Sequence, residues 1–315
     1  MNFKDMVDEV IINVAGYTQR QDQATYMVAI DDANPTVGLT DTPAGAWTPK
    51  TQDPYYAFKV TDGDSLSRGT VEIGDELVWV DSFDRASGIA YIAPDGRGFR
   101  NSKVSAHSIG SRVVISPVYP RVVVQKALNN AIIGVYPDLF GVYYTTFPFV
   151  AARNTYQIPT EAVEVLSVKW QTVGPTREWL PIRRWRMDKI SDIGTFNTGK
   201  TLSIYDGIVP GRTVNVTYSK RPNELTLDSD DFTDSGLPDS AAEVVILGAA
   251  YRVSAYLDTP RVTGMSVEAD ALDQSTPSGA GAQASRYFFA QYKDRLGIEM
   301  RRQYELFPTR VHYTR

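Results

Sequence analysis

The chain has 315 residues, of which 43% are hydrophobic and 22% charged, and its formal net charge is −5. This composition is typical of a globular protein, and the length allows more than one domain. Cysteine is absent, which excludes disulfides and thiolate chemistry, and the two histidines, His107 and His312, are too few for a histidine-rich metal centre.

The chain begins with a pattern that predicts an amphipathic helix from residue 3 to about residue 20. Apolar residues recur there at intervals of three and four, and Asn2 is placed to cap the first turn. This charged, helical start differs from a signal peptide, and no apolar run of the chain is long enough to span a membrane. We therefore expect no membrane partner.

Residues 24–116 change to short alternating runs that are separated by turn residues. Strands are predicted at Tyr56–Val60, Glu76–Val80, Gly88–Ile92 and Arg112–Ile115. The acids of the turn Asp62-Gly63-Asp64 are interpreted as turn residues, because no series of calcium ligands follows them. Several short strands at this spacing favour a small β-barrel, inserted between two helices.

Helical periodicity returns after Pro117 and should end before Pro137. A second β region is predicted at about 142–222, with strands at Thr155–Pro159, Val163–Trp170, Leu202–Tyr205 and Thr213–Tyr218. Two further helices, at about 240–257 and 283–304, flank a linker rich in Ser and Gly at 275–281. The sequence thus predicts an α+β fold, in which residues 1–23 and 117–315 form one helical domain and residues 24–116 form the inserted barrel.

Charge is unevenly distributed along the second half of the chain. Residues 223–273 hold eleven acids against two arginines, whereas residues 283–315 hold seven basic residues against three acids. Opposite patches suit a ring of identical subunits, in which one side of each copy meets the other side of the next. The predicted contacts between subunits involve Arg183, Arg184, Arg186, Arg301, Arg302, Asp230 and Asp231.

The run Arg183-Arg184-Trp185-Arg186 also mixes basic and aromatic residues as grooves for single-stranded nucleic acid do. In a chain of net charge −5 we favour a protein partner for it.

The terminal segment 305–315 combines aromatic and basic residues, which is unusual for an unpartnered tail. Pro308 should end the last helix and direct the chain into an extended form. The segment either folds back on its own domain or docks on a partner chain. Its candidate docking residues are Phe307, Pro308, Arg310, Val311, Tyr313 and Arg315.

Motifs for catalysis are weak. His107 lies between Ser105 and Ser108, but no carboxylate that could orient it is evident from the motif, so we interpret it as structural. The chain has neither a Walker-type phosphate loop nor a dinucleotide-binding fingerprint. We expect no catalytic residue, no metal and no cofactor.

The order of these parts resembles the head-to-tail adaptor, or connector, proteins of tailed bacteriophages. The resemblance rests on the four-helix layout and on a β region that opens with Tyr156-Gln157-Ile158-Pro159 and Val163–Val168, an arrangement that the tail tubular A proteins share. In style the chain is most similar to adaptors of long-tailed actinobacteriophages, through segments 67–78, 97–100, 106–111 and 308–313.

The resemblance implies a non-enzymatic virion protein of the neck, made in the host cytoplasm. It implies a ring, usually dodecameric, beneath the portal, with double-stranded DNA passing through the bore without sequence-specific binding. The partners would be the portal protein, further copies of the chain, and a stopper or tail-tube protein. The C-terminal segment would bind the portal.

A second hypothesis is a carbohydrate-binding or carbohydrate-processing component of a phage tail. The chain contains five tryptophans that could stack on sugars, namely Trp47, Trp79, Trp170, Trp179 and Trp185. A glycosidase would also need two carboxylates across a cleft.

Overall fold

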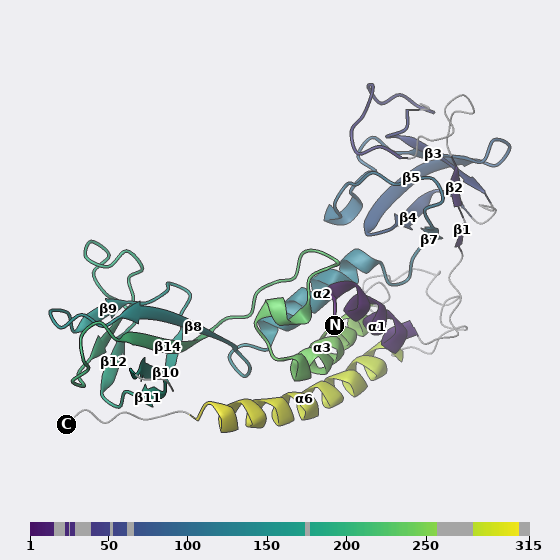
Figure 1. Ribbon diagram of the computed structural model, residues 1–315. Coiled ribbons are helices and arrows are strands. Elements are labelled where there is room, and N and C mark those ends of the chain that lie inside the picture. Colours follow the sequence, from purple (N-terminus) through teal and green to yellow (C-terminus); the bar gives the residue numbers. More distant parts are fainter. Residues whose placement is uncertain are drawn as a thin grey trace. The chain divides into compact units, whose positions relative to one another are not determined.

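The computed structural model describes residues 1–15, 23–24, 26–28, 39–50, 53–61, 66–173, 177–256 and 280–308 (Figure 1). Contacts within the chain group it into two compact units, Met1–Met6 with Leu128–Arg315, and Val7–Ala127. The described residues form four α-helices and three antiparallel sheets, which confirms the predicted α+β class. The closed barrel, the adaptor layout and the domain boundaries at 23 and 117 stay predictions.

The helices begin and end near the predicted positions, except that the predicted end of the first helix, at about residue 20, lies outside the described residues. They are α1 (Phe3–Ala15), α2 (Arg121–Gly134), α3 (Ala242–Tyr256) and α6 (Ala280–Leu306). Asn2 caps α1, since its Oδ1 accepts the backbone N–H of Asp5 at 2.8 Å. Helix α6 ends at Leu306, two residues before Pro308. This end is expected, because a proline disfavours the helical conformation of the residue that precedes it. Of the predicted linker, residues 275–279 lie outside the described residues and residues 280–281 belong to α6.

The unit Val7–Ala127 contains a seven-stranded antiparallel sheet in the order β1-β7-β4-β5-β6-β3-β2. Its strands are β1 (Gln23–Ala24), β2 (Tyr26–Val28), β3 (Ala57–Thr61), β4 (Gly69–Ile73), β5 (Glu76–Asp84), β6 (Ile89–Ile92) and β7 (Val113–Ile115). β4 and β5 are joined by a two-residue turn, in which Gly74 has a φ of 62°. Phe58, Val71, Val78, Ala90 and Val113 are among the buried residues of its core. The turn at 62–64 lies outside the described residues.

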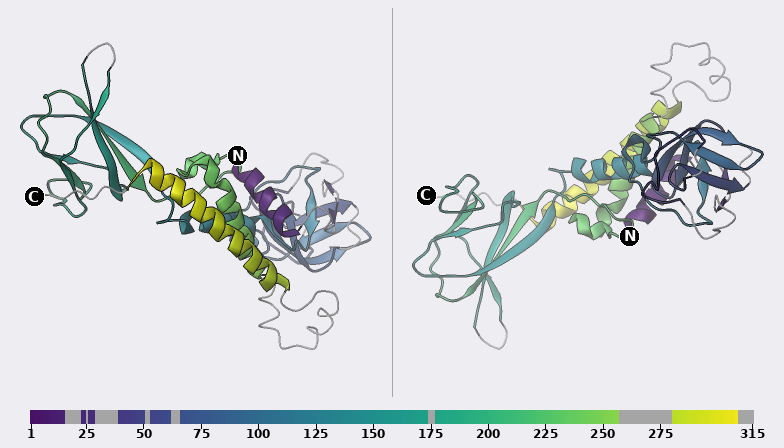
Figure 2. Two further views of the ribbon diagram at one scale, coloured as in Figure 1. Left: turned by 90° about the horizontal axis from the view of Figure 1, so that it is seen from below. Right: turned by 90° about the horizontal axis from the view of Figure 1, so that it is seen from above.

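In the other unit, α3 packs along α6 (Figure 2). Helix α3 is buried on most of its surface, since nine of its fifteen residues are buried. Gly248 lets the helices approach closely, because a Cβ atom there would lie 3.2 Å from the ring of Tyr292 and 3.2 Å from the Cβ of Ala131. The helical part of this unit therefore depends on a small residue in the middle of α3.

The second β region forms two sheets, with orders β11-β10-β14-β8 and β12-β13-β9. The strands are β8 (Gly141–Pro148), β9 (Thr155–Gln157), β10 (Glu164–Gln171), β11 (Trp179–Pro181), β12 (Trp185–Asp188), β13 (Thr201–Ile204) and β14 (Thr213–Lys220). Both sheets contribute to one hydrophobic core, which includes Val168, Leu202, Ile204, Val214 and Val216.

Tyr156 fixes the loop that connects β8 and β9. Its hydroxyl accepts the N–H of Val150 at 2.9 Å and lies 3.0 Å from the carbonyl of Val150 and 2.9 Å from that of Arg153. The ring stacks on Phe147 with a centroid distance of 4.4 Å. The tyrosine that opens the second β region thus has a structural role.

Candidate docking groove

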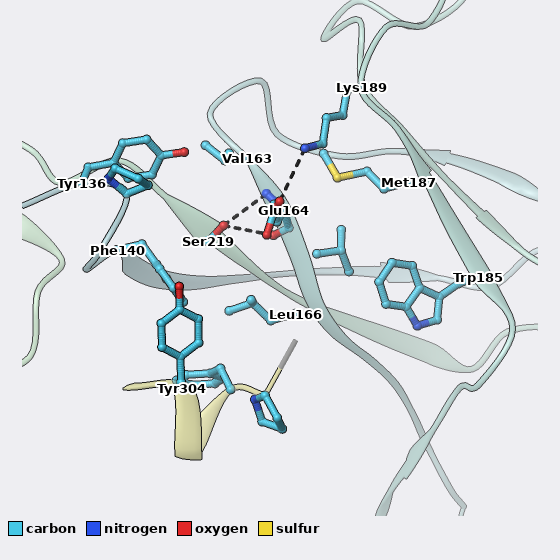
Figure 3. A pocket seen from close by; sticks show the side chains of 14 residues that line it. Tyr136, Phe140, Val163, Glu164, Leu166, Trp185, Met187, Lys189, Ser219 and Tyr304 are labelled. Atoms are coloured by element: carbon cyan, nitrogen blue, oxygen red, sulfur yellow. Dashed lines mark hydrogen bonds and ion pairs between the residues drawn. The ribbon is translucent and has the colours of Figure 1, made fainter. Parts of the chain in front are cut away.

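A groove of about 480 Å³ lies beside the C-terminal end of α6 (Figure 3). Its lining residues come from the end of α6, the segment after α2, and the strands β10, β12 and β14. They are Tyr136, Pro137, Phe140, Val163, Glu164, Val165, Leu166, Trp185, Met187, Lys189, Ser219, Tyr304, Phe307 and Pro308. We call this cavity the docking groove.

The docking groove exists because β12 diverges from β10. β11 pairs with β10 over Lys169–Gln171, and the N–H of Ile182 still donates to the carbonyl of Val168 at 2.9 Å. The next two N–H groups, of Arg183 and Arg184, donate instead to Oδ2 of Asp206 at 2.7 and 3.1 Å. The chain then pairs with β13 as β12. β10 and β12 are therefore the two arms of a fork, and the groove lies between them.

Asp206 holds the chain at the branching point. Burial disfavours its ionised form, but the N–H groups of Arg184 and Arg183 and the Arg184 guanidinium outweigh this effect and lower the pKa of Asp206. The Nε of Arg184 lies 3.0 Å from Oδ1 of the same carboxylate. One ionised side chain thus satisfies the backbone groups that leave the β10 ladder.

Most of the side chains that line the groove are apolar, but its surface also exposes polar atoms, those of Glu164 and Lys189 among them. Val165, Trp185 and Met187 are half-buried and pack against the core of the β region. Lys189 and Glu164 connect the two arms of the fork, with their charged atoms 3.6 Å apart (Figure 3). Both side chains are more than half exposed, so the ion pair can be rearranged at a small energetic cost.

The structure places two of the predicted docking residues in this groove. Phe307 is half-buried and Pro308 is exposed, and both line the cavity. Arg310, Val311, Tyr313 and Arg315 lie outside the described residues. The predicted portal contact therefore stays a prediction, but its first residues border a real cavity.

The predicted interface arginines divide into two groups. Arg184, Arg186 and Arg302 pair within the chain with Asp206, Asp188 and Glu299, at 3.0, 3.3 and 2.7 Å. The side chains of Arg183 and Arg301 are exposed and have no ion-pair partner among the described residues. These two cations are thus the better candidates for a contact with another molecule.

Asp230 and Asp231, also predicted at the interface, bind the chain's own backbone. Oδ2 of Asp230 accepts the N–H groups of Thr226 and Leu227, both at 2.8 Å. Asp231 accepts the N–H of Thr233 at 3.0 Å and lies 3.2 Å from the amino group of Met1. These hydrogen bonds lower the pKa of both carboxyl groups. A contact with a neighbouring subunit remains a prediction for them.

The sequence analysis did not find a basic pocket that adjoins the docking groove. Lys189, Lys200, Lys220 and Arg221 line it, against one acid, Glu161. Nζ of Lys200 donates to the carbonyls of Thr160 and Ala162, while Lys220 and Arg221 stack over Tyr143 and Tyr136. The four cations come from three separate segments, so no run of basic residues indicates the pocket.

The unit Val7–Ala127 contains a buried ionic network around Glu76. The carboxylate is fully buried and lies 2.7 Å from Nε and 3.0 Å from Nη2 of Arg97. It accepts the N–H groups of Gly98 and Ser105 at 3.0 and 3.1 Å, and it lies 2.9 Å from Nε2 of His107. The carboxylate partner of His107 is thus thirty-one residues away in the sequence.

This network is not arranged as a catalytic triad. The hydroxyl of Ser105 lies 3.3 Å from Nε2 of His107, the same nitrogen that contacts Glu76. A triad needs the nucleophile and the carboxylate on opposite nitrogens of the ring. Because a carboxylate can only accept here, Nε2 carries the proton and cannot act as a base toward Ser105.

The described residues contain no group of three or more acidic or histidine side chains that could hold a metal ion. None of the helices in the described ranges is long and apolar enough to cross a bilayer. The tryptophans are mostly packed, since Trp47, Trp79, Trp170 and Trp185 are half-buried and Trp179 is 39% exposed.

A family model described as SU10 adaptor protein matches residues 111–312, which is more than half of the chain. The chain belongs to the SU10 adaptor protein family. This is a phage adaptor family whose role is structural, in the neck of the virion between the head and the tail. The matched segment includes α2, the second β region, α3, α6 and the docking groove. No curated protein matches the chain.

Proposed function

We propose that this protein forms a ring that joins the portal of a tailed phage to the stopper or tail tube and surrounds the DNA conduit. The membership of residues 111–312 in the phage adaptor family supports this proposal most strongly. Twelve is the number of copies that the resemblance implies. The protein would act without catalysis, and double-stranded DNA would pass through the bore.

The charge distribution supports contacts between copies. Arg183 and Arg301 are exposed and without an ion-pair partner in the described ranges, while residues 223–273 are strongly acidic. Exposed ion pairs contribute only about 0–1 kcal/mol each, so a ring interface of this kind should be collective and sensitive to salt. Arg184, Arg186 and Arg302 would contribute less to the contact between copies, because each is already paired with an acidic residue of its own chain.

The segment 306–315 is proposed to be the contact with the portal. Aromatic residues and arginine are the types that protein interfaces favour, and Phe307, Tyr313, Arg310 and Arg315 supply them. Helix α6 ends at Leu306, and Pro308 disfavours its continuation.

Native mass spectrometry of the purified chain, alone and with portal rings, tests the proposal. We expect a closed oligomer, either directly or once portal is added, and loss of portal binding after truncation at Pro308. A chain that stays monomeric with portal present would overturn it, and retention of labelled glycans by that monomer would favour the carbohydrate hypothesis.

A paired charge reversal tests the ring contact separately. The double variant Arg183→Glu/Arg301→Glu should weaken assembly, whereas Arg68→Glu/Arg85→Glu changes the net charge equally but lies outside the segment that the family model matches. Equal assembly of the two double variants across a salt titration would contradict the proposed contact.

A further inference from the structure

One arm of the fork has an uncovered strand edge. β10 pairs with β14 from Glu164 to Trp170, with a register shift between Val165 and Ser167, but it pairs with β11 only over Lys169–Gln171. From Glu164 to Ser167, no described strand pairs with the second edge of β10. Uncovered edges attract another strand, and proteins normally protect them.

The uncovered edge borders the docking groove, because Glu164, Val165 and Leu166 of β10 line it. Val165 and Leu166 line the groove from β10, and Trp185 and Met187 line it from β12. A peptide in extended form could use the backbone groups of β10 for affinity and place alternate side chains against these residues. The shape therefore fits a strand better than a helix.

We propose that residues 309–315 of the same chain dock in this fork as an added strand beside β10. The described chain reaches Pro308, which itself lines the groove, so the segment 309–315 is attached next to the proposed site. Seven residues in extended form span about 23 Å, and the four-residue free edge needs about 13 Å. The segment is thus long enough to cover it without a change in α6.

The sequence of the segment has the period of a strand. Val311 and Tyr313 alternate with Arg310, His312 and Thr314, so one face is apolar and the other polar. The apolar face suits Val165 and Trp185, and the basic face can approach Glu164. Pro308 lacks an N–H group, which is consistent with pairing that begins after it.

This inference goes beyond the proposed function, because it assigns the segment a binding site in the free subunit. Portal binding by the segment rests on the proposed function. If the segment binds the portal, the fork and the portal compete for residues 309–315. The portal contact would then form only at the expense of the contact with β10. Docking itself can be measured without portal, so its failure leaves the adaptor role untouched.

The absence of cysteine in the chain allows a direct test by disulfide trapping. In the variant Leu166→Cys/Val311→Cys, mild oxidation of the free chain should give an internal disulfide at the mass of one chain. The control Val173→Cys/Val311→Cys carries its first cysteine at a position that is 69% exposed outside the groove. We expect at least about tenfold faster formation in the first variant, the advantage of a held pair over a random encounter.

Equal rates in the two variants would overturn the proposal. A disulfide that joins two chains would overturn it too, since the occupant would then be a second copy.

Hydrogen exchange gives an independent measurement that needs no cysteine. Within Val165–Ser167, truncation after Pro308 should speed about tenfold the exchange of the amides that face the groove rather than β14, and it should leave α3 unchanged, because only the covered edge is opened. Unchanged exchange at Val165–Ser167 would contradict docking.

Discussion

Replacing Glu76 by Gln should destabilise the unit Val7–Ala127 by about 3 kcal/mol. The carboxylate is fully buried, and Arg97, whose side chain is 2% exposed, would keep its charge without a counterion. The amide of Gln would also direct N–H groups toward the donors of Arg97, Gly98 and Ser105. The variant therefore preserves the shape of the side chain and removes the charge that the site is built around.

Two routes give a similar magnitude. Burial alone would raise the pKa of Glu76, but hydrogen bonds from His107 and Arg97 outweigh it and lower the pKa from 4.5 to about 2. At about 1.4 kcal/mol per pKa unit, this difference corresponds to about 3 kcal/mol of stability at neutral pH. Removing one partner of a buried ion pair typically costs about 3–5 kcal/mol.

A urea titration, with pulsed hydrogen exchange of the β4 and β5 amides, reports on this unit specifically. With a slope of about 2 kcal/mol per M, the midpoint of the variant should fall by about 1.5 M. Because the folded pKa lies below the unfolded value, the contribution of Glu76 is complete above pH 4.5 and is lost as the pH falls toward 2. The difference between wild type and variant should therefore shrink over this range.

The matched control is Asp81→Asn, which breaks an exposed pair with Arg68 at 3.4 Å and should cost at most about 1 kcal/mol. A midpoint for Glu76→Gln within error of that control would refute the reasoning. So would a difference that stays constant down to pH 3, since it could not come from the charge of Glu76.

Two further stability predictions concern a buried acid and a pair of glycines. Burial raises the pKa of Glu72 to about 7, although the N–H and the charge of Arg121 oppose this, so Glu72→Gln should be more stable than wild type above pH 7 by about 1–3 kcal/mol. That advantage should shrink as the pH falls from 7 and vanish below pH 4.5, where Glu72 is protonated in both the folded and the unfolded wild type; urea titrations at pH 5 and 8.5 check the sign. Gly236→Ala should destabilise the protein more than Gly211→Ala. The two glycines have nearly the same φ, 84° and 82°, but only at Gly236 would the new Cβ clash with the hydroxyl of Tyr143. We expect about 1–2 kcal/mol for the backbone strain alone and a further loss for the clash, and equal thermal midpoints would contradict this.

The helices could be predicted because their stabilising signals are local. Each helix needs only an apolar face and the residues at its ends, such as Asn2 before α1 and Pro308 after α6. Predicted strands with clear alternation, such as β5, β10 and β14, are present in the structure. These elements carry their burial pattern in consecutive residues.

The strands that were missed lack such a local pattern. β4 buries Val71, Glu72 and Ile73 in succession, and the buried carboxyl group of Glu72 accepts the N–H of Arg121 at the start of α2. β8 alternates between half-buried and exposed residues of similar type, and it is defined by its long pairing with β14. In both cases tertiary contacts outweigh the local propensity.

The docking groove shows most clearly why a site of this kind cannot be predicted from a motif. The sequence analysis assigned Arg183 and Arg184 a role through their side chains, on the basis of charge. The structure shows that their backbone N–H groups, held by Asp206, direct the chain away from β10 and open the fork. Nothing in the sequence near residue 206 indicates this contact, because it depends on the pairing of β12 with β13. The carboxylate of Asp206 therefore links the basic run at Arg183 and Arg184 to the cavity. We expect Asp206→Ala to change the shape of the groove more than it changes any contact of the arginine side chains.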